Sequence, residues 1–245
     1  MGTSESFISH LLELRTRLLY AFGGLLVVFV CLVPWAGDLY ALLAEPMLAK
    51  LPKGGKMIAI DVITPFFVPL KVAMMTAFLI SLPYILYQAW LFVAPGMHAH
   101  EKRLMLPLVA ASVVLFFAGM AFAYFAVFPV VFGFFSGAAP QGVAVMTDID
   151  KYLSFVMGMF LAFGTTFEVP VAVVVLVKLD MVSIAKLKEV RPYMIVCAFI
   201  LGALLTPPDV VSQFMLAIPL WLLYEVGVIV AGWMIKDSKS IELKN

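Results

Sequence analysis

The chain has 245 residues, of which 64% are hydrophobic and only 13% are charged, and its mean hydropathy is +1.09. A soluble domain is about one-quarter charged, so this composition excludes that class and is typical of a protein that crosses a membrane several times. The net charge of +1 gives no field that would attract nucleic acid. Cys31 and Cys197 lie in separate apolar runs, where we expect them to pack rather than to form a redox pair.

The residues before the first apolar run repeat with the period of a helix. Leu11, Leu14 and Leu18 form one stripe, whereas Glu13 and Arg17 fall on the opposite face. This pattern predicts an amphipathic helix that lies at the membrane surface and leads into the first span.

Six apolar segments predict six membrane-spanning helices, and therefore an all-α integral membrane protein. We expect one domain over residues 1–235 and a charged cytoplasmic tail over 236–245. The spans are expected at about 18–36, 66–93, 104–130, 152–177, 193–205 and 210–235. The last two are predicted to be short. The fifth has only about 13 residues, which at 1.5 Å each cover about 20 Å of a core about 30 Å thick.

Three details concern the segment between the first and second spans. A short amphipathic helix in this loop is expected to be interrupted at Pro46, and Thr64-Pro65 is expected to start the next helix. Lys71 lies less than two turns inside the second span and is expected to snorkel outward without a functional role.

The basic residues predict the orientation of the chain. Six spans place both termini on one side, and that side carries most of the 16 Lys and Arg residues. They occur before the first span, between the second and third, between the fourth and fifth, and after the sixth. Both termini are therefore expected in the cytoplasm.

Two acidic residues lie within predicted spans. Glu168 is well inside the fourth span and precedes Pro170, which removes a backbone hydrogen bond. Glu168 is either a functional group or a carboxyl group that only hydrogen-bonds inside the bundle. Glu225 is closer to the cytoplasmic end and is expected mainly to snorkel.

Two further polar sites have plain structural explanations. Asp209 is expected to cap the last helix after the turn 206–209, and Gln213 could hydrogen-bond across a helix contact. Glu13 could simply pair with Arg17, and Glu101 could be a solvated loop charge. Two carboxylates at one cytoplasmic face would instead suit guanidinium groups, which carboxylates bind bidentately.

Enzyme signatures are missing from the sequence. It contains no metalloprotease, nucleophile-elbow or phosphate-loop motif, so we expect no catalytic residues and no cofactor. His10, His98 and His100 lack acidic or thiol partners at ligand spacing, so no metal site is expected.

A set of short motifs resembles the TatC family, the receptor subunits of the twin-arginine protein translocase. The resemblance runs from about residue 7 to 232, and its motifs are specific in combination. They are His10-Leu-Leu-Glu13-Leu-Arg15, Phe92-Val-Ala-Pro95, His100-Glu101-Lys-Arg103, Gly119-Met-Ala-Phe-Ala-Tyr124, Phe128-Pro129, Phe163-Gly164-Thr-Thr-Phe167-Glu168-Val-Pro170, Arg191-Pro192-Tyr193 and Leu205-Thr206-Pro207-Pro208-Asp209.

The resemblance implies a cup-shaped bundle in the inner membrane that moves folded proteins, using the proton-motive force. It implies that paired-arginine signal peptides bind Glu13 and Glu101 at the cytoplasmic face. The remaining roles are carried over residue by residue: Arg15, Phe92 and Arg103 shape the binding patch, Pro46 and Phe66 belong to a periplasmic cap, and Glu168 and Gln213 are polar positions where the single-span partners TatA and TatB dock. It also implies a multi-copy receptor complex.

Two other functions remain open at this point. A proton-coupled small-molecule transporter could use Glu168 as its titrating group, although the sequence shows no internal repeat. A scaffold for membrane-protein assembly would leave Glu13 and Glu101 dispensable.

Overall fold

The computed structural model describes residues 2–48, 58–93, 105–137, 148–206 and 209–242. Regular structure in these ranges is helical, apart from an isolated bridge that pairs Ile58 with Asp148. The helices are α1 (Gly2–Leu32), a 3-10 turn (Val33–Trp35), α2 (Ala36–Leu48), α3 (Thr64–Val93), α4 (Met105–Phe122), a π-helical turn (Ala123–Val127), α5 (Phe128–Gly137), α6 (Ile149–Phe167), α7 (Val169–Lys178), α8 (Ile184–Glu189), α9 (Arg191–Leu205) and α10 (Val210–Glu242).

Five helical stretches in the described part of the chain are long and apolar enough to cross a membrane. A further apolar helix, α9, has 15 residues. The predicted all-α membrane fold is therefore confirmed. The count of six crossings and the cytoplasmic termini stay predictions.

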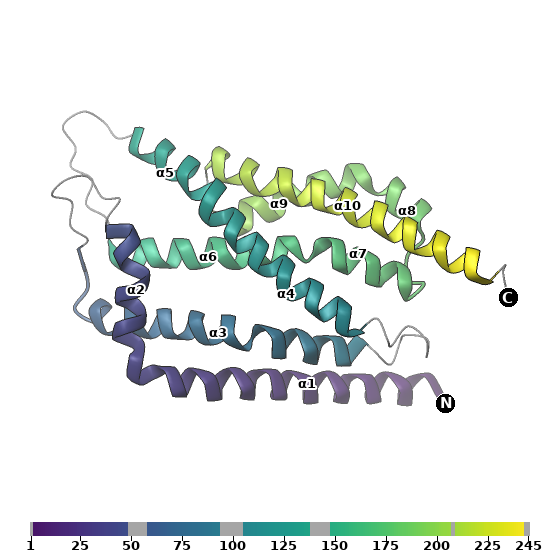
Figure 1. Cartoon of the computed structure of the whole chain (residues 1–245), viewed down its shortest axis with the longest axis horizontal. Coiled ribbons are helices and arrows are strands. Elements are labelled where there is room, and N and C mark those ends of the chain that lie inside the picture. The colour runs from purple at the N-terminus through teal and green to yellow at the C-terminus, as the bar shows by residue number, and fades with distance from the viewer. Residues whose placement is uncertain (1, 49–57, 94–104, 138–147, 207–208, 243–245) are drawn as a thin grey trace. The chain divides into compact units, whose positions relative to one another are not determined.

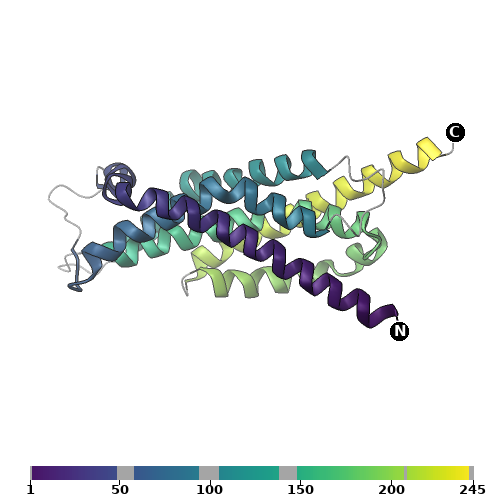
Figure 2. The same cartoon turned by 90° about the horizontal axis from the view of Figure 1, so that it is seen from below.

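The chain divides into two compact units, which are described separately. The first contains residues 1–109 and 141–155. In it α1 and α3 lie side by side, and α2 turns away from α1 (Figures 1 and 2). The two long helices approach closely at Gly24, where an added Cβ would lie 2.6 Å from the ring of Tyr84. As predicted, α3 begins at Thr64 with a proline in its first turn.

The amphipathic stretch leads into the first apolar run as predicted, because α1 continues unbroken from Gly2 to Leu32. No proline separates the two, so the backbone hydrogen bonds carry through. Its position at the membrane surface stays a prediction. The expected interruption at Pro46 is wrong, because α2 ends only at Leu48. A proline in a last turn removes one hydrogen bond close to where the ladder ends anyway.

Proline shapes the third and fourth apolar stretches. The N–H of Phe128 donates to the carbonyl of Ala123, which makes the π-helical turn between α4 and α5. Pro129 follows directly and has no N–H, and the widened turn accommodates it without ending the helix. Between α6 and α7 the helix breaks at Glu168, two residues before Pro170.

The second unit contains residues 110–140 and 156–245. Its core joins α7, α8 and α10 through the buried residues Val173, Val174, Val177, Leu187, Tyr224, Val228 and Ala231. The fifth predicted span is short, as expected, because α9 has only 15 residues.

The prediction that the last helix is short is wrong, because α10 has 33 residues. It accommodates Pro219 in its interior and continues from the apolar run into the charged segment that begins at Lys236. The apolar pattern ends where the membrane is expected to end, but Lys, Glu and Ser do not prevent a helix from continuing into water.

Candidate functional site

The polar face of α1 is held against the end of α3. The His10 ring stacks on the Phe92 ring, with 4.4 Å between ring centroids and 27° between planes. Glu13 lies one turn further along the same face of α1. Its Oε1 atom is 3.5 Å from Nη2 of Arg17, and both side chains are about 30% exposed. This is a long contact that an incoming guanidinium group could replace, because ideal charge-assisted pairs are closer to 2.8 Å.

Arg15 does not join this group. Residues two apart on a helix point in nearly opposite directions, so Arg15 lies across α1 from Glu13. It borders an open hollow of about 380 Å³ on the leucine side of the helix, together with Leu11, Leu18 and Phe22. Arg15 is therefore placed at an apolar surface, whereas Glu13 lies on the side of α1 that carries His10.

The other residues predicted for this region have different positions. Glu101 and Arg103 lie outside the described residues, as does the side chain of Pro46 in the last turn of α2. Phe66 is in the first turn of α3, is 68% exposed and meets Phe67 edge to face.

Glu168 sits at the break between α6 and α7 as the residue before the first turn of α7. Its N–H donates to the carbonyl of Thr165, three residues earlier, so this turn is tighter than an α-helical one. The hydroxyl groups of Thr165 and Thr166 both donate to the carbonyl of Ala162. The hydroxyl protons of both threonines are therefore used within α6 and are not donated to the Glu168 carboxylate. Its Oε1 atom is buried and has no hydrogen-bond partner.

One face of α4 packs closely along α6. A Cβ added at Gly119 would lie 2.4 Å from the carbonyl oxygen of Phe163, and one at Gly164 would lie 2.6 Å from the ring of Phe116. Ser112, one turn further toward the start of α4, is 1% exposed and hydrogen-bonds Glu168. The two glycines thus let the helices approach until a serine reaches the carboxylate.

A second polar site joins α9 to α10. Asp209 Oδ1 accepts the N–H of Ser212 at 2.7 Å, which confirms its predicted role as the cap of α10. Gln213 donates from Nε2 to the carbonyl of Phe199 at 2.9 Å and packs against Gly202. The expected hydrogen bond of Gln213 across a helix contact is also confirmed.

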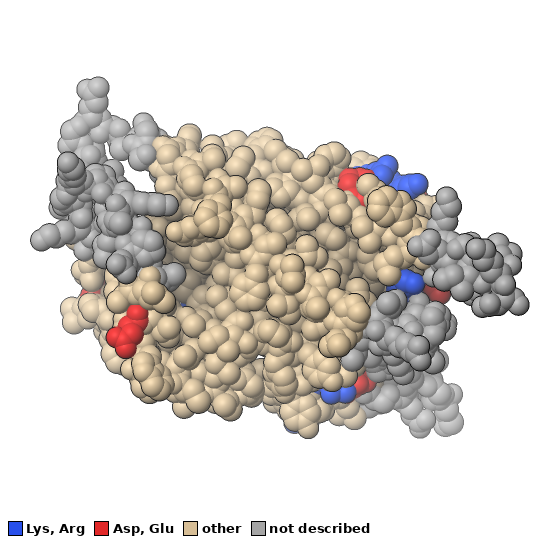
Figure 3. Space-filling view, viewed as in Figure 1, with Lys and Arg blue, Asp and Glu red and all other residues tan. Residues whose placement is uncertain are grey.

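The surface agrees with a membrane setting. On the face that Figure 3 shows, charged side chains are few, and most of the described surface is uncharged. Within the described ranges, no three His, Cys, Asp or Glu side chains gather as a metal site would require.

Comparison with known proteins decides the family. The model of the Sec-independent protein translocase protein (TatC) matches residues 9–219. The chain is 49% identical to the TatC protein of Escherichia coli K12 over 98% of its own length and 93% of that protein's length. It is 52% identical to TatC of Azotobacter chroococcum mcd 1, over 90% and 87% of the two chains. The chain belongs to the TatC family.

A solved TatC structure has the same fold. The chain matches the crystal structure of a twin-arginine translocase receptor, TatC, with a TM-score of 0.80 at 37% identity, over 91% of this chain and 98% of that one. As a member of the TatC family, the chain is a multi-pass membrane protein and a subunit of the Sec-independent protein translocase. The interpretation as a small-molecule transporter is not supported.

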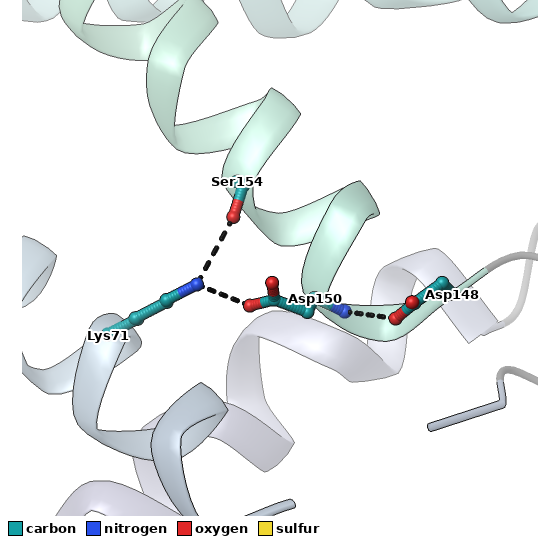
Figure 4. A network of polar contacts seen from close by, with 4 residues as sticks. All are labelled: Lys71, Asp148, Asp150 and Ser154. Carbon is teal, nitrogen blue, oxygen red and sulfur yellow. Dashed lines mark hydrogen bonds and ion pairs between the residues drawn. The ribbon is translucent and has the colours of Figure 1, made fainter. Parts of the chain in front are cut away.

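The chain also carries an interhelical ion pair that sequence reasoning missed. The ammonium group of Lys71, on α3, pairs with Asp150 at the start of α6 and also reaches Ser154 (Figure 4). The Asp150 N–H in turn donates to the carboxylate of Asp148 at 2.8 Å. The expectation that Lys71 only snorkels is wrong. The sequence did contain an indication of the ion pair, because Lys71 and Asp150 lie near the predicted starts of their spans, on the same side of the membrane.

Glu225 has a partner as well. Its Oε2 atom accepts from Nη2 of Arg191, the first residue of α9, at 2.6 Å. Beside it, the hydroxyl of Tyr224 donates to the carbonyl of Leu187 in α8 at 2.7 Å. Together these bonds hold α8 and the start of α9 onto α10. They favour a structural role for Glu225 over free snorkelling.

Proposed function

We propose that this chain is the signal-peptide receptor and core subunit of the twin-arginine translocase. Glu13 and Glu101 bind the paired arginines of a signal peptide at the cytoplasmic face, and Phe92 and Arg103 shape the patch. Arg15 acts from the leucine side of α1, against the apolar part of the peptide or the lipid surface.

The contact between His10 and Phe92 carries this proposal. It fixes the polar face of α1 beside the end of α3, directly before the segment that contains Glu101. The Glu13 carboxylate has only a long contact, of 3.5 Å, with Arg17. A planar guanidinium that binds a carboxylate through two hydrogen bonds is a stronger partner than a single 3.5 Å contact.

The single-span subunits TatA and TatB are the proposed partners within the membrane. Glu168 and Gln213 are polar positions for their docking, and α9, about 22 Å long by its 15 residues, suits a short partner helix. Pro46 and Phe66 form part of the periplasmic cap. The complex lies in the inner membrane with both chain termini in the cytoplasm, contains several copies, and moves folded cargo with the proton-motive force.

Copurification tests the proposal. The full chain, expressed with TatA and TatB and solubilised in mild detergent, should copurify with a precursor whose signal peptide carries paired arginines. A precursor with paired lysines is the matched control, because lysine keeps the charge but cannot bind bidentately. Equal recovery of both precursors would contradict recognition by carboxylates.

A further inference from the structure

Ser112 has a fixed position opposite Glu168. Three residues of α4 lie on one face at helical spacing and meet α6 and α7 in antiparallel order: Gly119 meets Phe163, Phe116 meets Gly164, and Ser112 meets Glu168. A Cβ at Gly119 would meet the backbone of Phe163, and one at Gly164 would meet the ring of Phe116, so neither position leaves room for a larger residue. This close packing places Ser112 beside Glu168.

The polar groups at this contact are few. Ser112 is 1% exposed, and its hydroxyl hydrogen-bonds the Glu168 carboxylate. The carboxylate keeps a buried oxygen, Oε1, without a partner. A buried acceptor left unpaired is costly, so the carboxylate depends on its hydrogen bond with Ser112 to stay in place.

We propose that Ser112 is a positioning residue that holds the Glu168 carboxylate in one orientation at the site where a partner helix docks. This inference rests on the docking role proposed for Glu168. It assigns to Ser112 no contact with the partner itself.

Infrared spectroscopy tests the positioning without any partner. The purified chain carries ¹³C-labelled glutamate carboxyl groups, and subtraction of the Glu168→Gln spectrum isolates the Glu168 band. Ser112→Ala should shift that band, and Ser112→Cys, of similar size but a weaker donor, should shift it less. Ser81→Ala is the control, because Ser81 is also a buried serine in a spanning helix but has no partner. An unmoved band in a folded Ser112→Ala chain would overturn the proposal.

Transport of a paired-arginine precursor into vesicles with TatA and TatB gives the second readout. Ser112→Ala should slow transport about tenfold, because one hydrogen bond to a carboxylate is lost. The same change should have no more than about a twofold effect in a Glu168→Gln background, since the group to be positioned is gone.

Equal effects of Ser112→Ala in the two backgrounds would overturn the positioning role, and so would an unaffected rate when the band has shifted. Failure of the unsubstituted chain to transport the precursor would instead refute the proposed function. The infrared result would still decide whether Ser112 orients Glu168.

Discussion

Gly119→Ala is the sharpest test of how α4 packs on α6. The added Cβ would lie 2.4 Å from the carbonyl oxygen of Phe163 and 3.0 Å from the ring of Phe167. Ordinary contacts are about 3.5 Å, so the helices must separate by about 1 Å. The closest atom belongs to the backbone and cannot rotate away. Overpacking of this kind costs about 1–3 kcal/mol, and we expect the free energy of unfolding to fall by about 3 kcal/mol.

Gly158→Ala is the matched control. Gly158 lies on α6, and a Cβ added there meets nothing within 4 Å. Alanine is a better helix former than glycine by about 0.8–1 kcal/mol, so this variant should be neutral or slightly more stable. Denaturant-induced unfolding in detergent, followed by tryptophan fluorescence, measures both variants. Equal stability of the two variants would refute the close contact between α4 and α6.

Three further predictions concern polar contacts. Lys71→Ala should lower the free energy of unfolding by about 1 kcal/mol, and exchanging Lys71 and Asp150 should recover most of that loss; no recovery would mean that the pair is not formed. Glu225→Gln should destabilise the chain by about 1–2 kcal/mol, but by much less when Arg191 is already replaced by Gln, as thermal unfolding of the four chains will show. Gln213→Ala should cost only about 1 kcal/mol, so a fall of more than tenfold in TatB copurification would be due to docking, whereas unchanged copurification would remove Gln213 from the docking site.

The sequence predicts the helices of this fold well and their ends less well. Apolar runs of sufficient length require helices, because the bilayer offers no other partner for backbone groups. The break at Glu168 follows from Pro170, whose position is visible in the sequence. The length of α10 does not follow, because hydropathy falls at Lys236 whereas the helix continues to Glu242. Hydropathy reports the edge of the membrane and helix propensity reports the end of the helix, and the two need not coincide.

In the candidate site too, some contacts can be predicted from the sequence and others cannot. The contact between Glu13 and Arg17 is local, and i,i+4 spacing alone predicts it. The bonds of Ser112 with Glu168 and of Lys71 with Asp150 join residues far apart in the chain. Their pairing depends on which helix faces meet, and no periodicity within one helix contains that information.

Arg15 is a different kind of case. The family resemblance places it in the same patch as Glu13, and the two are close in sequence. Helix geometry separates them, because a step of two residues turns the side chain to the far side of α1. Residues of one motif can therefore share a function without lying on the same face of a helix.

Crosslinking of a paired-arginine signal peptide to the purified complex tests the central claim most directly. Replacing both Glu13 and Glu101 by alanine should lower the yield at least tenfold, and replacing both by lysine should lower it further, because repulsion is added to the loss of pairing. Asp180→Ala, which removes an exposed acid on the turn after α7, is the control and should leave the yield unchanged. An unchanged yield in the double alanine variant would contradict the account.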